Sequence, residues 1–335
     1  MRAPFNPCYY ARRYSNSQQS YMSQQVQFFT ITDDNAGQRI DNFLVARLKG
    51  APKSLIYRII RRGEVRVNKG RVKPERKLAV GDLVRVPPIR LAEPDAPAPA
   101  GKSLLLALED AILYETDQLM VVNKPSGLAV HGGSGVNLGL IEAMRQLKVK
   151  DTALELVHRL DRETSGCILI ARKRSMLRYL QDLFRGEKQV DKRYQALVKG
   201  RWPNRAHSVN VPLLKGEVGN GERIVRASPE GKPSRTEFDV LERFEGTTLI
   251  EARPITGRTH QIRVHAQYKG HPLVGDDKYG DDEFNKVMSQ FGSRRLFLHA
   301  GYLGVPMPDG EYLEFRAPLP DDLQATLKQL KASER

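Results

Sequence analysis

A proline-rich run divides this chain into two parts of different character. Residues 91–103, LAEPDAPAPAGKS, contain Pro94, Pro97 and Pro99 among alanine and acidic residues. Proline fixes φ and lacks a backbone donor, so such a run is extended and semi-rigid. A length of 335 residues suits about two or three domains. We therefore predict a linker at 91–103, with a small domain before it and a larger domain at 104–335.

The part before the linker has the pattern of two short helices followed by strands. Ser54 and Gly63 are the predicted N-cap and C-terminal stop of the second helix. EVRVNKGRV alternates around a turn at Asn68–Gly70, and DLVRVPP follows as a further strand. Residues 1–24 are rich in Gln, Ser and Asn, and we predict a flexible tail there. The apolar positions at helical spacing are Ile40, Phe43, Leu44, Leu48, Leu55, Ile56, Ile59 and Ile60.

Positive charge is concentrated in this same part of the chain. Between Gln38 and Arg90, fifteen Lys or Arg residues stand against four acidic residues, which makes +11 of the chain's net charge of +15. A surface this basic attracts phosphate groups and releases counterions when it binds them. The charge therefore predicts a polyanionic partner, with a generic solvated surface as the alternative.

Residues 38–86 resemble a known RNA-binding domain. QRIDNFLVARLKGAPKSLIYRIIRRGEVRVNKGRVKPERKLAVGDLVRV is similar, over nearly its whole length, to the domain first described in small-subunit ribosomal protein four. We assign the domain to residues 25–90. The resemblance implies that basic residues of the second helix and of the hairpin bind RNA phosphates, although each could be an ordinary exposed charge. These residues are Lys53, Arg58, Arg61, Arg62, Arg66, Lys69 and Lys73.

Beyond the linker, many short apolar runs predict strands, with few helices between them. Many strands with few intervening helices favour an α+β domain on a largely antiparallel sheet. Neither a GxGxxG sequence nor a Walker loop occurs. The predicted strands are LMVVNKP, CILIARK, YQALVKG, TEFDVLERF, TTLIEARPI and RLFLHAGYL, and the predicted helices are SMLRYLQDLF, HQIRVHAQYKG and LQATLKQLK.

The densest group of polar residues is LVHRLDRETSG, residues 156–166, directly before the predicted strand CILIA. A polar loop on the rigid support of a buried strand is a common position for catalytic residues. Spacing alone leaves open whether Asp161 is catalytic or only an ion-pair partner of the neighbouring arginines.

This segment and three others resemble the RluA-type pseudouridine synthases. HRLDRETSG agrees with the form HRLD-x-x-TSG at every fixed position, and VVNKPSGLAVHGG, DKRYQALVKG and PITGRTHQIRVHAQYKGHPLVGDDKYG match the remaining motifs in order. The resemblance implies that Asp161 is the catalytic residue and that Arg159 enters the RNA where the uridine leaves. It also implies that Tyr194 packs against the target base and that Arg263 pairs with the carboxylate. A core tyrosine and a structural ion pair remain the alternatives for Tyr194 and Arg263.

The family resemblance implies an isomerase with the pseudouridine synthase fold that acts on RNA. The basic first domain favours members that modify ribosomal RNA, and the runs QRIDNFL, LVHRLDRETSG and GERIVR resemble those of members that modify the large-subunit RNA. Since all bonds change within one nucleotide, we expect no cofactor and no metal. His260 and His265 also lack the i, i+4 spacing of a zinc pair. Whether the aspartate acts as a nucleophile or removes a sugar proton remains open.

Three other functions remain as alternatives. The first is a non-catalytic RNA-binding or ribosome-assembly protein, and the second is a synthase acting on transfer RNA. The third is a hydrolase using His158 or His260 with Ser165, although no Gly-x-Ser-x-Gly elbow occurs. No run of eighteen apolar residues occurs, and two cysteines are too few for a disulfide framework. We therefore expect a cytoplasmic protein that acts away from membranes. We also expect it to act as a monomer.

Overall fold

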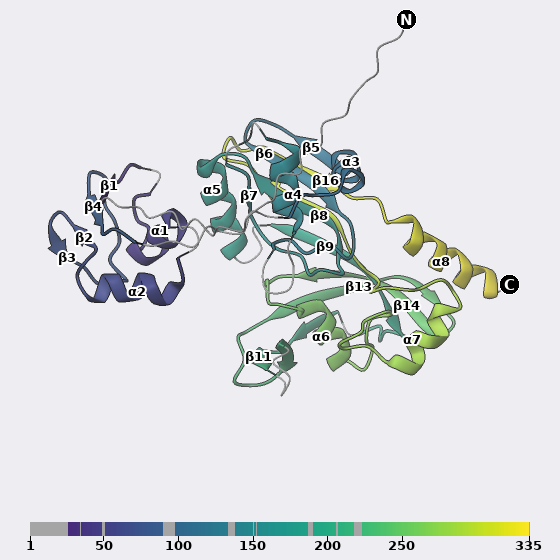
Figure 1. The fold of residues 1–335 in the computed structure, drawn as a ribbon. Coiled ribbons are helices and arrows are strands. Elements are labelled where there is room, and N and C mark those ends of the chain that lie inside the picture. Colours follow the sequence, from purple (N-terminus) through teal and green to yellow (C-terminus); the bar gives the residue numbers. More distant parts are fainter. Residues whose placement is uncertain are drawn as a thin grey trace, which may run out of the picture. The chain divides into compact units, whose positions relative to one another are not determined.

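Two units make up the chain, Met1–Ala96 and Pro97–Arg335 (Figure 1). The computed structural model describes residues 26–33, 35–48, 51–89, 98–132, 138–149, 151, 153–186, 190–205, 207–217 and 223–334. The predicted tail at 1–24 and residues 91–97 of the predicted linker lie outside the described residues.

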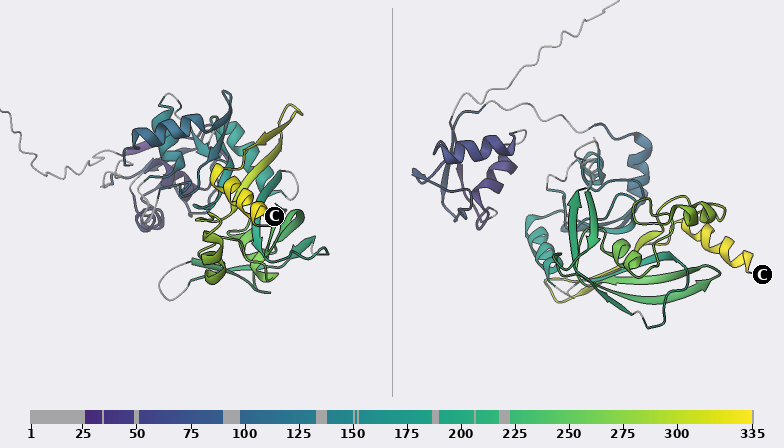
Figure 2. Two further views of the ribbon diagram at one scale, coloured as in Figure 1. Left: turned by 90° about the vertical axis from the view of Figure 1, so that its right-hand side faces the viewer. Right: turned by 90° about the horizontal axis from the view of Figure 1, so that it is seen from below.

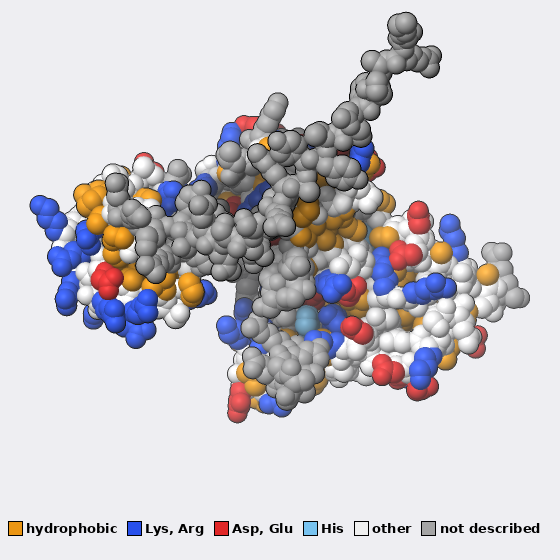
Figure 3. Space-filling view, viewed as in Figure 1, with side chains coloured by type: hydrophobic (Ala, Val, Ile, Leu, Met, Phe, Trp, Pro, Cys, Tyr) orange, Lys and Arg blue, Asp and Glu red, His pale blue; other side chains and the backbone are white. Residues whose placement is uncertain are grey.

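The first unit has two helices packed on one face of a four-stranded antiparallel sheet, in the order β1-β4-β2-β3. The apolar residues predicted for the two helices are buried here or packed against the core, as their helical spacing required. Lys and Arg side chains outnumber acidic ones on the visible face of this unit (Figure 3). The elements are β1 (Gln27–Thr30), α1 (Ile40–Arg47), α2 (Lys53–Arg61), β2 (Arg66–Val67), β3 (Gly70–Arg71) and β4 (Leu83–Val86).

The ends of α2 and of the hairpin follow from backbone conformation. The prediction that Ser54 caps α2 is wrong: the helix already begins at Lys53, after the extended backbone of Pro52 (φ −58°, ψ 142°). Gly63 follows the helix at φ 70°, which glycine adopts without steric cost. Asn68 and Lys69 join β2 to β3, both at positive φ, as a two-residue hairpin turn requires.

The second unit is built on a ten-stranded sheet, with β10-β13-β14-β9-β15-β8-β6-β5 in order, β16 beside β15, and β7 beside β8. Of the described strand pairs, only β8 with β15 is parallel, so the predicted α+β class with a mostly antiparallel sheet is confirmed. The strands are β5 (Ile112–Glu115), β6 (Leu119–Lys124), β7 (Glu155–Leu156), β8 (Ser165–Ala171), β9 (Asp191–Lys199), β10 (Ser208–Asn210), β13 (Arg235–Phe244), β14 (Thr247–Pro254), β15 (Leu298–Pro306) and β16 (Tyr312–Arg316). A separate hairpin consists of β11 (Leu213–Glu217) and β12 (Arg223–Ala227).

Helices cover both faces of this sheet (Figure 2). Along β6, Met120 and Val122 pack under α3 and α4, whereas Leu119 and Val121 pack on the side of α5. This alternation is the period of two expected for a strand that is buried on both faces. In the other half, α6 lies on one face and α7 and α8 on the other. The helices are α3 (Lys102–Asp110), α4 (Leu140–Leu147), α5 (Arg174–Arg185), α6 (Gln261–Tyr268), α7 (Asp282–Ser289) and α8 (Asp321–Ser333).

Each of the six predicted strands and three predicted helices of this region corresponds to one of these elements, with ends that differ by up to three residues. Helices α3, α4 and α7 are additional, and α3 begins at Lys102, near the end of the stretch assigned to the linker. Among the described helices, none combines the length and the apolar character that crossing a membrane requires.

The parallel contact between β8 and β15 depends on one glycine. Gly166 lies opposite Ala300 in this pair, and its φ of 114° is rare for any other residue. A Cβ at this position would overlap the backbone of Ala300. Gly166 therefore lets the strand that follows the polar loop approach β15.

We expect Gly166→Ala to lower the free energy of unfolding by about 2–5 kcal/mol, through backbone strain and overpacking together. Gly246→Ala is the matched control, because Gly246 also has positive φ (73°) but has open space around its Cβ position. It should cost only about 1–2 kcal/mol. Urea unfolding followed by the fluorescence of the single tryptophan, Trp202, measures both. Equal losses would contradict the steric account.

Candidate active site

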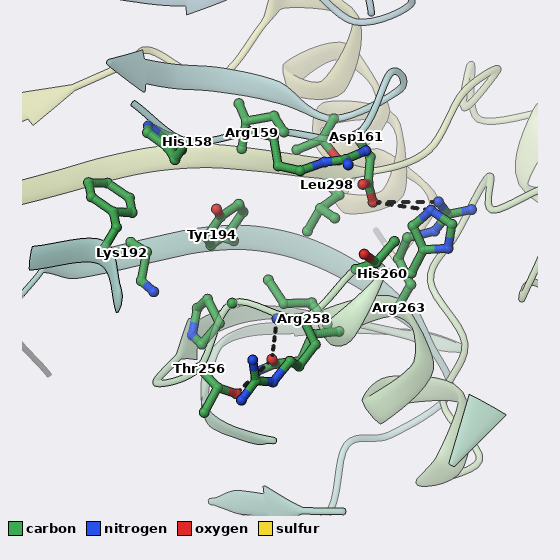
Figure 4. Close-up of a pocket in the computed structure, with 18 of the residues that line it drawn as sticks. His158, Arg159, Asp161, Lys192, Tyr194, Thr256, Arg258, His260, Arg263 and Leu298 are labelled. Carbon is green, nitrogen blue, oxygen red and sulfur yellow. Dashed lines mark hydrogen bonds and ion pairs between the residues drawn. The ribbon is translucent and has the colours of Figure 1, made fainter. Parts of the chain in front are cut away.

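The predicted site residues of the second unit meet in one pocket of about 430 Å³. The loop between β7 and β8 supplies Arg159 and Asp161, β9 supplies Tyr194, and α6 supplies Arg263 (Figure 4). Three motif segments that are far apart in the sequence therefore line one cavity. The seven basic residues predicted to contact RNA are all exposed on the first unit.

The loop that carries Asp161 is hydrogen-bonded to residues of the VVNKPSGLAVHGG motif. Lys124, at the end of β6, is fully buried, and its Nζ donates to the carbonyl oxygens of Pro125 (2.9 Å), Leu128 (2.8 Å) and Arg162 (2.9 Å). Ser126 Oγ donates to the carbonyl of Glu163 at 2.6 Å. These side-chain donors and backbone carbonyl acceptors thereby join the segment after β6 to the loop that carries Asp161.

The buried ammonium of Lys124 matches its surroundings in geometry. An ammonium group has three donors, and three carbonyl oxygens face it here. Burial nevertheless lowers the pKa of Lys124 to about 7, against the attraction of Glu163 and Asp161. The side chain is a structural support of the loop, because it ends on carbonyl groups outside the pocket lining.

Arg263 lies between the carboxylates of Asp276 and Asp161, and its Nη2 is also 3.5 Å from Oδ1 of the exposed Asp277. Its Nε and Nη2 donate to Asp276 at 2.7 and 2.6 Å, a bidentate and buried pair. Its Nη1 lies 3.7 Å from Asp161 Oδ2, an ion-pair distance without a direct hydrogen bond. Arg263 thus has a structural partner and also faces the loop carboxylate, so the two interpretations of this residue hold together.

Asp276 is the anchor of this arrangement. Its side chain is fully buried and also accepts hydrogen bonds from the backbone N–H groups of Lys278 (3.0 Å) and Tyr279 (2.9 Å). Burial opposes its charge, but Arg263 and these N–H groups outweigh burial and lower the pKa of Asp276. The Tyr279 ring lies 5.0 Å from the Arg263 guanidinium carbon. Arg263 is therefore fixed on several sides.

His260 is a site residue whose position the sequence did not reveal. It precedes α6 with φ 53°, a left-handed conformation that is uncommon outside glycine and asparagine. Its Nε2 lies 3.8 Å from Asp161 Oδ2, and its Nδ1 lies 2.8 Å from the hydroxyl of Tyr279. That hydroxyl accepts from the backbone N–H of Val225 at 2.9 Å, so its own proton is available for Nδ1. A neutral His260 therefore has its proton on Nε2, facing Asp161.

The protonation of His260 follows from its surroundings. Burial lowers its pKa, the charge of Asp161 raises it, and the charges of Arg263 and Lys278 lower it again. The net direction is downward, so the ring is neutral near pH 7 and presents an N–H donor to the carboxylate.

Tyr194 is a pocket residue on a strand of the sheet. It lies on β9 opposite Ala252 of β14 and packs against apolar clusters on either side. In the described part of the chain, its hydroxyl has no hydrogen-bond partner. Burial, with the charge of Asp161, raises the pKa of Tyr194, so the hydroxyl stays protonated. Arg159, in contrast, is exposed at the mouth of the same pocket.

The residues of the hydrolase alternative do not come together. His158 stacks on Phe184 at 4.5 Å, and its Nε2 accepts from the backbone N–H of Leu169 at 3.0 Å. Burial lowers the pKa of His158 to about 3, so the ring is neutral and already bonded. Ser165 lies outside the pocket lining, buried and 3.0 Å from His299 Nδ1. This geometry argues against a serine nucleophile at the site.

Within the described ranges, no group of three or more His, Cys, Asp or Glu side chains is arranged to hold a metal ion. The cluster at the site pairs two carboxylates with an arginine and a histidine. It is suited to holding and using a carboxylate charge.

Comparison with known proteins gives matches for both units. Residues 118–268 match the family model described as RNA pseudouridylate synthase, and residues 38–84 match the S4 domain. The chain is 55% identical over 314 residues to "Ribosomal large subunit pseudouridine synthase C" of Haemophilus influenzae, covering 93% of this chain and 97% of that protein. It is 54% identical over 310 residues to the protein of the same name in Escherichia coli (strain K12), covering 91% and 97%.

Among solved structures, "Human RNA Pseudouridylate Synthase Domain Containing 4" aligns with a TM-score of 0.58 and 31% sequence identity. The alignment covers 68% of this chain and 96% of that one. These sequence and structure matches extend over the second unit, which contains the motifs that resemble the pseudouridine synthases.

We expect NMR spectra of the histidine rings to show His260 neutral at pH 7, with its proton on Nε2. Asp161→Asn removes a charge that raises the His260 pKa, so that pKa should fall further. His265, which bonds Ser234 and Thr236, serves as the internal control and should not respond. A protonated His260 at pH 7, or an Nδ1–H tautomer, would contradict the hydrogen-bond chain described here.

Proposed function

We propose, from the premise that the chain belongs to the RNA pseudouridylate synthase family, that it converts uridines of large-subunit ribosomal RNA into pseudouridine. Family membership makes it an isomerase that acts on RNA. The ribosomal target is supported by the relatives of that name and by the S4 domain. The runs QRIDNFL, LVHRLDRETSG and GERIVR favour the same group within the family. With such a substrate, the enzyme would act in the cytoplasm.

The observation that carries the proposal is the pocket in which Asp161 faces Arg263 beside Tyr194. The reaction breaks the bond from the anomeric carbon to the ring nitrogen, turns the base, and joins the same carbon to carbon 5. Asp161 would supply the carboxylate, either as a nucleophile or by removing a sugar proton and stabilising positive charge. Its side chain is 18% exposed, so it is open to a substrate and partly shielded from water.

Arg263 and His260 would keep Asp161 charged and oriented. Their nitrogens lie 3.7 and 3.8 Å from the same oxygen, Oδ2. A bound RNA would exclude water from the pocket, which disfavours an isolated carboxylate. The fixed guanidinium and the imidazole N–H oppose that effect, and Oδ1 is left for the substrate.

Tyr194 and Arg159 would handle the target nucleotide. Moving a base out of its stack costs a few kcal/mol of stacking free energy, and stacking on an aromatic side chain offsets about 1–3 kcal/mol of that cost. Tyr194 presents a ring to the pocket, and Arg159 is exposed at its mouth, where it could fill the gap in the RNA. One copy of the chain supplies all these residues, as an enzyme acting as a monomer requires.

We further propose that residues 25–90 bind RNA and that residues 104–335 catalyse the reaction. The exposed Lys53, Arg58 and Arg61 of α2, followed directly by Arg62, form a basic series suited to RNA phosphates. The exposed Arg66, Lys69 and Lys73 continue it on and after the hairpin. A non-catalytic assembly protein would need this first unit but not the pocket. Transfer RNA remains the alternative substrate.

Asp161→Asn tests the function directly. We expect the wild-type chain to release tritium from carbon-5-labelled, unmodified large-subunit ribosomal RNA, and the variant to release none while it still binds the RNA. Release from transfer RNA alone would refute the proposed target. Equal release by the variant and the wild type would show that Asp161 is structural.

Tyr194 distinguishes stacking from core packing. We expect Tyr194→Leu to reduce kcat about fivefold to 150-fold, because it removes about 1–3 kcal/mol of stacking. RNA affinity should change little. Tyr194→Phe is the matched variant: it retains the ring and loses only a hydroxyl without a partner, so most of the activity should remain. A wild-type rate for the Tyr194→Leu enzyme would indicate that Tyr194 is only a core residue.

A further inference from the structure

The open face of the small sheet in the first unit carries one row of four side chains. Phe28 of β1 lies opposite Arg85 of β4, Arg85 lies opposite Arg66 of β2, and Arg66 lies opposite Arg71 of β3. Residues directly opposite each other in antiparallel strands point to the same face. The alternate residues, such as Val84, are buried under the helices. The row therefore lies on the face turned away from α1 and α2.

Phe28 does not belong to the apolar core that the described residues of this unit form. Its side chain is 59% exposed, whereas the next residue, Phe29, packs edge-on against Phe43 at 5.8 Å. Leu83, on the same open face, is 42% exposed. An aromatic ring on an open sheet offers a flat apolar surface to a ligand.

The three arginines lack acidic partners within the described residues. Like charges directly opposite each other in a sheet are destabilising unless an anion lies between them. The nearby acids are engaged elsewhere: Asp82 bonds Asn68 and Arg76, and Glu64 pairs with Arg62. The row therefore carries positive charge that a bound anion would compensate.

The arginine side chains are partly fixed in advance. Arg85 Nη1 donates to the carbonyl of Glu64 at 2.9 Å, and Arg66 Nε donates to the carbonyl of Gly63 at 3.3 Å. The Arg71 side chain crosses Gly63, where a Cβ would come 2.5 Å from its Nε. Each guanidinium has five N–H donors, and these contacts use only a few of them. The remaining donors are available to phosphate oxygens.

We propose that this face binds single-stranded RNA, with a base stacked on Phe28 and the neighbouring phosphates on Arg85, Arg66 and Arg71. The inference rests on the proposed function, since it takes RNA as the substrate. Four adjacent strands span about 14 Å, and other four-stranded RNA-binding sheets stack about two or three bases in such a space. The site adds a base contact to the phosphate contacts assigned to α2.

The experiment measures binding of the full chain to a fluorescein-labelled, unstructured RNA of about twelve nucleotides. We expect Phe28→Ala to weaken binding about tenfold and Phe28→Trp to preserve it. Val45→Ala is the matched control, since Val45 is an exposed apolar residue (38%) on α1, and its affinity should equal that of wild type. Arg71→Gln should reduce the slope of log affinity against log salt by about 0.7.

Several outcomes would overturn the inference. They are absence of wild-type binding to this RNA, wild-type behaviour of both Phe28→Ala and Arg71→Gln, or an equal loss in Val45→Ala. A tritium-release assay on the same preparations separates this inference from the proposed function. A chain that releases tritium while its variants bind normally contradicts the sheet-face site alone. A chain that shows the expected binding losses but releases no tritium contradicts the proposed function alone.

Discussion

A buried guanidinium needs a buried anion, and this requirement organises the pocket around Arg263 and Asp276. Their side chains are 6% and 0% exposed, and removing one partner of such a pair typically costs about 3–5 kcal/mol. Because Asp276 holds Nε and Nη2, only Nη1 faces Asp161, at 3.7 Å. The pair therefore supplies positive charge to Asp161 without occupying its oxygens in a bidentate contact.

Much of the fold follows from local patterns in the sequence. Helical spacing identified the buried faces of α1 and α2, and apolar runs identified the long strands, because both signals depend on residues close together in the chain. The HRLD motif likewise contains Asp161, which lines the pocket, and its catalytic role stays a prediction. Ser54 shows the limit of such rules. It is a good capping residue, but α2 begins before it, at Lys53, with Pro52 at the N-cap position.

The supports of the site depend instead on contacts that leave no periodic signal. Lys124 bonds the carbonyl of Arg162, 38 residues away, and any residue type could have supplied that carbonyl. His260 takes its tautomer from Tyr279, 19 residues away, and has a left-handed backbone conformation directly before α6. The sequence motifs contained these residues, but only the folded chain shows what each one holds.

The single parallel strand pair has a consequence for how the protein is made. The strand β8, which follows the Asp161 loop, is completed on one side by β15, about 130 residues later in the chain. Pairing across such a separation is slow, because a long loop must close before any contact is gained. During synthesis, the loop and its strand therefore emerge long before their support. The pocket can be assembled only after nearly the whole chain has left the ribosome, so a truncated product would be inactive even if it contained every motif residue.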